Sequence, residues 1–146
     1  MDDIRKSLVN TVEAQRVVVL ADACHSGGVS SSGGDKGVRV GQQNEALIRY
    51  WAELSKTSPG RVIFTSSDRS EISQESAKWG GGHGVFTWTL LEGLKGAADS
   101  DANGIVTLGE AIRYTDQRVR RETRSAQHPT VAGEKYDQNL PMGVVK

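Results

Sequence analysis

Two short hydrophobic runs, Arg16–Ala21 and Arg61–Thr65, are the strongest strand signals in the chain. Both are rich in β-branched residues and have the length of a typical strand, so each predicts a buried strand. Pro59-Gly60 stands directly before the second run and predicts a turn there. Thr130–Ala132 lies between Pro129 and Pro141 and predicts a strand at the edge of a sheet.

Four other segments repeat hydrophobic positions every three or four residues, which predicts amphipathic helices. Gly96 is expected to end the third of these helices. Because strands and helices alternate along the chain, the pattern predicts an α/β layered domain with a largely parallel sheet. The core-facing positions of the four helices are Ile4, Leu8 and Val12; Leu47, Tyr50, Trp51 and Leu54; Phe86, Leu90, Leu91 and Leu94; and Leu108, Ala111, Ile112, Thr115 and Val119.

Composition narrows the class of protein. The 146 residues suffice for one domain, and the formal net charge of zero gives no electrostatic reason to expect binding to nucleic acid or to an anionic membrane. No apolar stretch is long enough to span a bilayer, and the start of the chain lacks the features of a secretion signal. The single cysteine excludes an intrachain disulfide. We therefore expect a cytoplasmic protein without nucleic-acid or membrane partners.

The segment 26–41 is rich in glycine and serine and has few hydrophobic residues, so it predicts a flexible loop. Lys36 and Arg39 lie in it, where proteolysis is easy. One hypothesis is that the protein cuts itself after one of these two residues; the alternative is an uncut surface loop.

The only cysteine, Cys24, follows the first predicted strand within the segment Asp22–Gly28. The carboxyl end of a core strand is where α/β folds place their chemistry, and a thiolate there is a candidate nucleophile. The alternative is a small buried hydrophobic residue. Asp22 favours the first interpretation, because an unpaired carboxylate is costly to bury and suits an open cleft better than a core.

The hexapeptide Asp22-Ala23-Cys24-His25-Ser26-Gly27 resembles the nucleophile motif of the caspase-like cysteine peptidases (peptidase family C14, clan CD), in particular the bacterial and metacaspase-type branch. The segment Gly82–Leu94 resembles the helix that follows the substrate-binding loop in that family. The resemblance extends from about residue 17 to about residue 140. It implies the caspase-like (caspase-hemoglobinase) fold, a three-layer α/β/α sandwich with a mostly parallel sheet. Residues 1–146 would then form the C-terminal portion of the domain, without its early strands.

The resemblance also implies an activity. Cys24 would attack a peptide carbonyl and form a thioester acyl-enzyme. Asp22 would line the pocket for the residue before the scissile bond and favour Arg or Lys through charge-assisted hydrogen bonds. Ser66 and Asp68, which follow the second strand, would border the groove for the protein or peptide substrate. The alternatives are a structural carboxylate at Asp22 and an ordinary polar loop after the second strand.

The general-base histidine of this family lies upstream of the nucleophile strand. The chain has three histidines, His25, His83 and His128, and the resemblance assigns the base role to none of them. We therefore expect a complementary chain or segment to supply the base. The competing hypothesis is a non-catalytic, caspase-like pseudoenzyme or a calcium-responsive interaction module.

A separate motif, independent of the family, spans residues 99–110 and fits the EF-hand calcium loop at every expected position. Gly104 permits the sharp turn, and helical patterns flank the loop on both sides. The alternative is a helix connection rich in turn residues. Ca²⁺ is the only cofactor that we expect, and no organic cofactor is indicated. The candidate ligands are Asp99, Asp101, Asn103, Ile105 through its backbone carbonyl, Thr107 directly or through water, and Glu110.

Overall fold

The structure is a computed structural model, and it describes residues 14–22, 59–68 and 71–145. Several predictions lie outside these residues and stay predictions. They are the helices around 4–12 and 47–54, the loop 26–41 with Lys36 and Arg39, and the nucleophile Cys24 with its neighbour His25.

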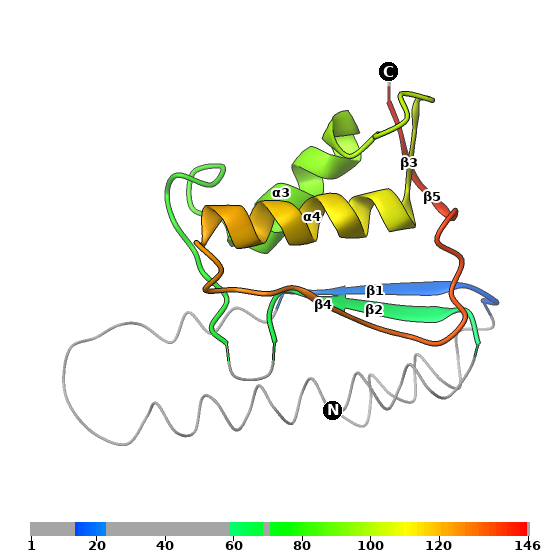
Figure 1. Cartoon of the computed structure of the whole chain (residues 1–146), viewed down its shortest axis with the longest axis horizontal. Helices are drawn as coiled ribbons and strands as arrows, with labels where there is room; N and C mark the ends of the chain where they lie inside the picture. The colour runs from blue at the N-terminus through cyan, green and yellow to red at the C-terminus, as the bar shows by residue number, and fades with distance from the viewer. Residues whose placement is uncertain (1–13, 23–58, 69–70, 146) are drawn as a thin grey trace.

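A three-stranded sheet forms the base of the described fold (Figure 1). Strands β1 (Val17–Ala21) and β2 (Arg61–Thr65) pair in parallel, with Val17 opposite Arg61 and Ala21 opposite Thr65. Strand β4 (Thr130–Ala132) pairs antiparallel with the other side of β2. The two predicted core strands and the predicted edge strand are thus confirmed, and the described sheet contains one parallel and one antiparallel pairing.

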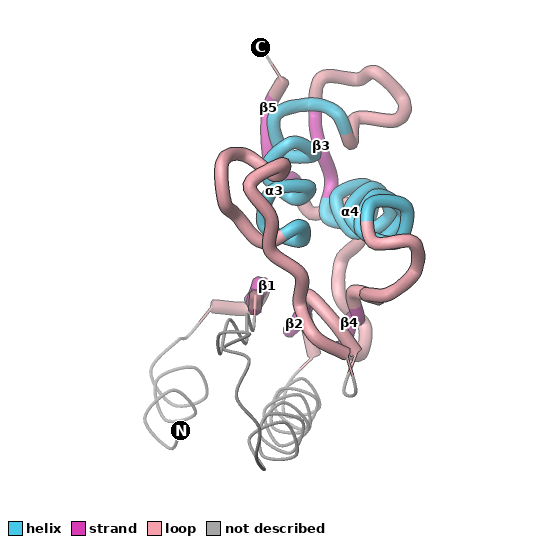
Figure 2. Tube along the Cα trace, turned by 90° about the vertical axis from the view of Figure 1, so that its left-hand side faces the viewer, coloured by secondary structure: helices cyan, strands magenta, loops and turns pink. Residues whose placement is uncertain are grey.

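Helices α3 (Val85–Glu92) and α4 (Leu108–Glu122) lie over the same face of this sheet, as the two perpendicular views show (Figures 1 and 2). The periodicity of α4 is confirmed. In α3, Phe86 and Leu90 are buried as predicted, but Leu91 is 48% exposed and does not face the core, so that part of the prediction is wrong. α3 continues into a π-helical segment, η2 (Gly93–Ala97). Gly96 has a φ of +126°, which is not helical, so the regular helical backbone is interrupted at Gly96 as predicted, although η2 is assigned as far as Ala97.

Aromatic packing joins the helical layer to the sheet. The rings of Phe64 on β2 and Phe86 on α3 meet edge to face with 4.9 Å between their centroids, an arrangement that aromatic pairs prefer. Three successive residues of β2, Val62, Ile63 and Phe64, are each at most 2% exposed. Because successive side chains of a strand point to opposite faces, both faces of β2 are covered, as in a layered α/β fold.

A second, two-stranded sheet was not predicted. Strand β3 (Ile105–Thr107) pairs antiparallel with β5 (Pro141–Val144) near the C-terminal end of the chain (Figure 1). β3 has only three residues, which is too short for a periodic signal. Its formation depends on pairing with residues more than thirty positions away, which no local pattern reveals. Among the described helices, none has the length and apolar character needed to cross a membrane.

Candidate active site

Asp22 lies directly after β1, at the edge of the sheet where the parallel strands β1 and β2 both end. Two hydroxyl groups from distant segments hold its carboxylate. Ser73 Oγ donates to Oδ1 at 3.1 Å, and Thr87 Oγ1, in the first turn of α3, donates to Oδ2 at 2.5 Å. These two hydrogen bonds fix the Asp22 carboxylate in place.

Ser66 leaves β2 beside the end of β1, because its backbone N–H donates to the carbonyl of Ala21 at 3.0 Å. Its side chain is 1% exposed. Within the described part of the chain, its Oγ is one of a few buried side-chain atoms without a hydrogen-bond partner. A buried hydroxyl without a partner costs free energy.

Asp68 is exposed and begins a turn with Glu71. Its backbone N–H donates to Glu71 Oε2 at 3.2 Å, and the Glu71 N–H donates to the Asp68 carbonyl at 3.1 Å. The Glu71 carboxylate also accepts from the backbone N–H of His128 at 2.6 Å and pairs with His128 Nδ1. His128 is thus partly buried and hydrogen-bonded to Glu71 in the loop after β2, and is not the plain surface residue that its place in the C-terminal tail suggests.

Gln127 is one of the residues at this edge that the sequence patterns did not reveal. It is fully buried between the segment after α4 and the loop after β2. Its Nε2 donates to the Ser66 carbonyl at 2.7 Å and to Ser73 Oγ at 3.3 Å, and its Oε1 accepts from the Gln74 N–H at 2.7 Å. Its position directly before His128 and Pro129, which lead into the edge strand, is the one feature of the sequence that could have drawn attention to it. A single glutamine contributes nothing to a hydrophobic pattern.

The loop 99–110 brings its candidate ligands together. Single carboxylate oxygens of Asp99, Asp101 and Glu110 lie within 4.8 Å of one another. Asp99 accepts from the N–H groups of Asn103 at 3.2 Å and Gly104 at 2.9 Å. Gly104 has a φ of +82°, a conformation that glycine adopts without strain. The turn that the motif requires is therefore present.

The structure also describes the other three predicted ligands of the loop, Asn103, Ile105 and Thr107. Asn103 Nδ2 donates to Asp101 Oδ2 at 2.9 Å, and Asn103 Oδ1 accepts from the Ile105 N–H at 2.7 Å. Ile105 begins β3, and Thr107 is the N-cap of α4. The part of the loop that forms β3 pairs with β5, so the loop is joined to the C-terminal strand of the same chain.

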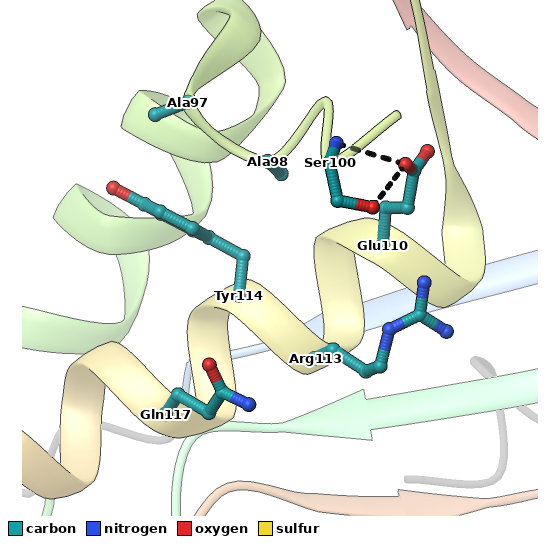
Figure 3. A pocket seen from close by; sticks show the side chains of 7 residues that line it. All are labelled: Ala97, Ala98, Ser100, Glu110, Arg113, Tyr114 and Gln117. Carbon is teal, nitrogen blue, oxygen red and sulfur yellow. Dashed lines mark hydrogen bonds between the residues drawn. The ribbon is translucent and has the colours of Figure 1, made fainter. Parts of the chain in front are cut away.

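Glu110 has a second structural role, because Thr107 and Glu110 form a capping box at the start of α4. One carboxylate oxygen accepts from the N–H and Oγ1 of Thr107 at 2.9 and 2.8 Å, and the other from the N–H and Oγ of Ser100 at 3.0 and 2.7 Å (Figure 3). These hydrogen bonds, the one from the Thr107 backbone first, lower the pKa of Glu110 from 4.5 to about 2. Glu110 is thus ionised across the physiological range.

A cavity of about 220 Å³ opens beside this carboxylate, between the end of η2 and α4 (Figure 3). Ser100 and Glu110 lie at one end of it, and Tyr114 and Gln117 line the flank of α4 at the other. Its lining residues are Ala97, Ala98, Ser100, Glu110, Arg113, Tyr114 and Gln117.

A comparison with models of protein families matches the caspase domain of peptidase family C14 over residues 1–140. The chain belongs to the caspase-domain family. Searches of curated proteins and of solved structures found no match. Membership of this family identifies the chain as a hydrolase domain of the cysteine-peptidase type that acts on proteins, and it agrees with the α/β class seen in the described residues.

Within this caspase domain, the structure brings together two of the three predicted substrate-binding residues. Asp22 and Ser66 lie at the ends of the paired strands β1 and β2, linked through Ser73 and Gln127. Asp68 lies further along the loop, exposed and turned into contact with Glu71. Cys24 lies outside the described residues, two positions after Asp22.

Proposed function

We propose that the chain is a cysteine endopeptidase of the metacaspase type that cleaves after Arg or Lys, with Cys24 as its nucleophile. The observation that carries this proposal is the Asp22 carboxylate, which two hydroxyl donors fix at the carboxyl ends of the parallel strands. A guanidinium forms paired, charge-assisted hydrogen bonds with such a group, and an ammonium forms a single one. The family supports cysteine peptidase chemistry.

The reaction follows nucleophilic catalysis by a thiolate. Cys24 Sγ attacks the peptide carbonyl carbon, and a C–S bond forms. The C–N bond then breaks, and the amine leaves with a proton from the general acid. Water hydrolyses the thioester, which releases the new carboxylate and returns the thiol. The role of Asp22 is to hold the basic side chain before the scissile bond, so that the carbonyl lies within reach of Cys24.

The general base is proposed to come from a complementary chain or segment, with the present chain as the C-terminal portion of the domain. Two of the chain's histidines belong to the described residues. His128 is paired with Glu71, and His83 is an exposed residue before α3. The family resemblance gives neither the base role, because its base precedes the nucleophile strand.

The test is covalent labelling of Cys24 by peptidyl chloromethyl ketones that end in Arg or in Asp, followed by intact mass. The chain is assayed with and without a segment that carries a His-Gly strand end. Labelling by the Arg probe that exceeds labelling by the Asp probe, and that disappears in Cys24→Ala, supports the proposal. No labelling in the complete assembly contradicts the peptidase and leaves the non-catalytic, caspase-like module.

We also propose that the loop 99–110 binds Ca²⁺ and stabilises the domain. Calcium takes oxygen ligands at about 2.3–2.6 Å, so two ligands on opposite sides of the ion are separated by about 4.6–5.2 Å. Any two ligands of one ion therefore lie at most about 5.2 Å apart, and the three carboxylate oxygens, which lie within 4.8 Å of one another, satisfy that limit. Asn103, Thr107 and the Ile105 carbonyl would complete an all-oxygen set. The capping box explains Thr107 and Glu110 without calcium, but α4 does not need Asp99 and Asp101 for its cap.

Calorimetric titration with CaCl₂ tests this second proposal. The wild-type chain should bind one ion, and Asp99→Asn together with Asp101→Asn should abolish the heat. Asp116→Asn is the matched control, because Asp116 pairs with Arg120 on α4 and lies outside the loop. No heat of binding at millimolar calcium contradicts the site.

A further inference from the structure

We propose that Gln127 is a positioning residue for the substrate-binding carboxylate of Asp22 and acts on it through Ser73. This inference rests on the proposed role of Asp22 in binding a basic side chain. It assigns a function to a fully buried amide that lies 105 positions after Asp22, in the short segment before strand β4.

The orientation of the Gln127 amide is fixed by its neighbours. Its oxygen faces the N–H of Gln74 at 2.7 Å, and its nitrogen faces the carbonyl of Ser66 at 2.7 Å. Rotation of the amide by half a turn would bring two donors together and two acceptors together. The remaining N–H of the amide therefore points to Ser73 Oγ, 3.3 Å away.

The direction of the next hydrogen bond follows from this one. Ser73 Oγ accepts from Gln127, and the ionised Asp22 carboxylate can only accept. The Ser73 hydroxyl proton must therefore point to Asp22 Oδ1, at 3.1 Å. The amide of Gln127 thus fixes the orientation of the Ser73 hydroxyl, and that hydroxyl holds Oδ1 of Asp22 in position. Thr87 on α3 holds the other oxygen, Oδ2, by a separate hydrogen bond.

The same amide also holds the second proposed substrate-binding residue. Through the Ser66 carbonyl it fixes the backbone of the residue whose Oγ is buried without a partner. The Gln127 side chain thus connects the carboxyl ends of β1 and β2 to the segment that leads into β4. It reaches β1 through Ser73 and Asp22, and β2 through the Ser66 carbonyl.

The experiment measures inactivation of the complete assembly, prepared with the wild-type chain or with Gln127→Met, by two chloromethyl ketones that end in Arg or in its neutral isostere citrulline. Labelling of the chain's one cysteine separates the inhibition constant KI from the rate constant kinact. Gln127→Met should raise KI for the Arg probe about 5- to 10-fold, the range expected for a lost hydrogen bond in a charged network. It should leave KI for the citrulline probe and both kinact values unchanged.

Ser73→Ala should raise KI for the Arg probe to the same extent and leave KI for the citrulline probe unchanged. The double variant should have the same KI for the Arg probe as Ser73→Ala alone, because Gln127 and Ser73 act on Asp22 through one series of hydrogen bonds. The matched control is Thr115→Val, a buried change on α4 at a hydroxyl without a partner. If Gln127→Met does not fold, as judged by circular dichroism, Ser73→Ala and its Arg-to-citrulline ratio decide the question.

Equal KI increases for both probes, or additive effects in the double variant, would overturn the positioning role and leave Gln127 as a structural tie. These outcomes differ from a failure of the proposed function itself. In that case the wild-type chain would already fail to distinguish Arg from citrulline, and both ideas would be overturned.

Discussion

The candidate active site and the calcium loop are built in opposite ways. The Asp22 site gathers residues from the end of β1, the loop after β2, the first turn of α3 and the segment before β4. The loop 99–110 supplies all of its candidate ligands from twelve consecutive residues. The first site depends on tertiary packing, and the second depends on local turn geometry.

The hydrogen bonds reflect this contrast. Ser73 and Thr87 reach Asp22 across 51 and 65 positions of sequence, whereas the donors to Asp99 lie four and five positions away. Loss of packing between α3 and the sheet should therefore damage the first site more than the second.

The largest effect is expected for Phe86→Ala, which removes the ring that joins α3 to Phe64 on β2. Phe86 is 1% exposed, so the substitution leaves a cavity and should lower the free energy of unfolding by about 3–5 kcal/mol. Urea denaturation measures the change. Leu91→Ala on the exposed side of the same helix is the control and should cost less than about 0.5 kcal/mol. A loss for Phe86→Ala as small as that of the control would refute the account of the core.

The next largest effect is expected for Asp22→Asn at the assembled site. The amide keeps the shape of the side chain and loses its charge, so KI for an Arg chloromethyl ketone should rise about 10- to 100-fold. KI for the citrulline probe should change little. Asp116→Asn removes an equivalent charge on α4 and should alter neither constant. An unchanged KI for the Arg probe would show that Asp22 is only a structural carboxylate.

At the local site, Glu110→Gln should weaken calcium binding at least about tenfold, because it removes the carboxylate expected to hold the ion with both oxygens. Glutamine also suits the N3 position of a capping box, so α4 should keep its first turn. Calorimetry measures the binding, and circular dichroism measures the helix. Full calcium affinity in Glu110→Gln would mean that Glu110 serves only the helix cap.

A smaller effect should appear in the pH dependence of stability. Hydrogen bonds hold the pKa of Glu110 at about 2 in the folded chain, below the ordinary value of 4.5. As the pH falls, the unfolded chain takes up the proton first, so this contribution is complete above pH 4.5 and is lost toward pH 2. Unfolding by urea between about pH 5 and pH 3, with a chelator present, should show a flatter profile for Glu110→Gln than for the wild type. Parallel profiles would contradict the assigned hydrogen bonds.

The smallest effect is expected for Thr115→Val, which replaces a buried hydroxyl without a partner by a methyl group. The change should be neutral or should stabilise the fold by up to about 1 kcal/mol. Thermal unfolding measures it. A clear loss of stability would show that the hydroxyl has a partner in solution, such as a bound water.

The sequence predicted the local features well. The runs around Val19 and Ile63 form the expected strands, and the periodicity through Leu108 and Val119 forms α4. The turn at Gly104 followed from residue types at fixed spacing. Each of these depends on a few neighbouring residues, whose preferences are visible in the chain itself.

The relations between distant segments could not be predicted in the same way. The pairing of β3 with β5, the contact of His128 with Glu71 and the amide of Gln127 behind Asp22 all depend on how the elements pack. Asp22 was singled out by its place after a strand and by the family resemblance of its motif, but its two hydroxyl donors, Ser73 and Thr87, were not. Serine and threonine are common in loops and helices, and only the fold selects these two.

The most direct test of the central claim is the ratio of Cys24 labelling rates for Arg and citrulline chloromethyl ketones in the complete assembly. The two probes have the same shape and differ in charge. If the fixed carboxylate of Asp22 binds the substrate's basic side chain, the Arg probe should react at least about tenfold faster, and Asp22→Asn should bring the ratio close to one. Equal rates in the wild type would contradict the claim.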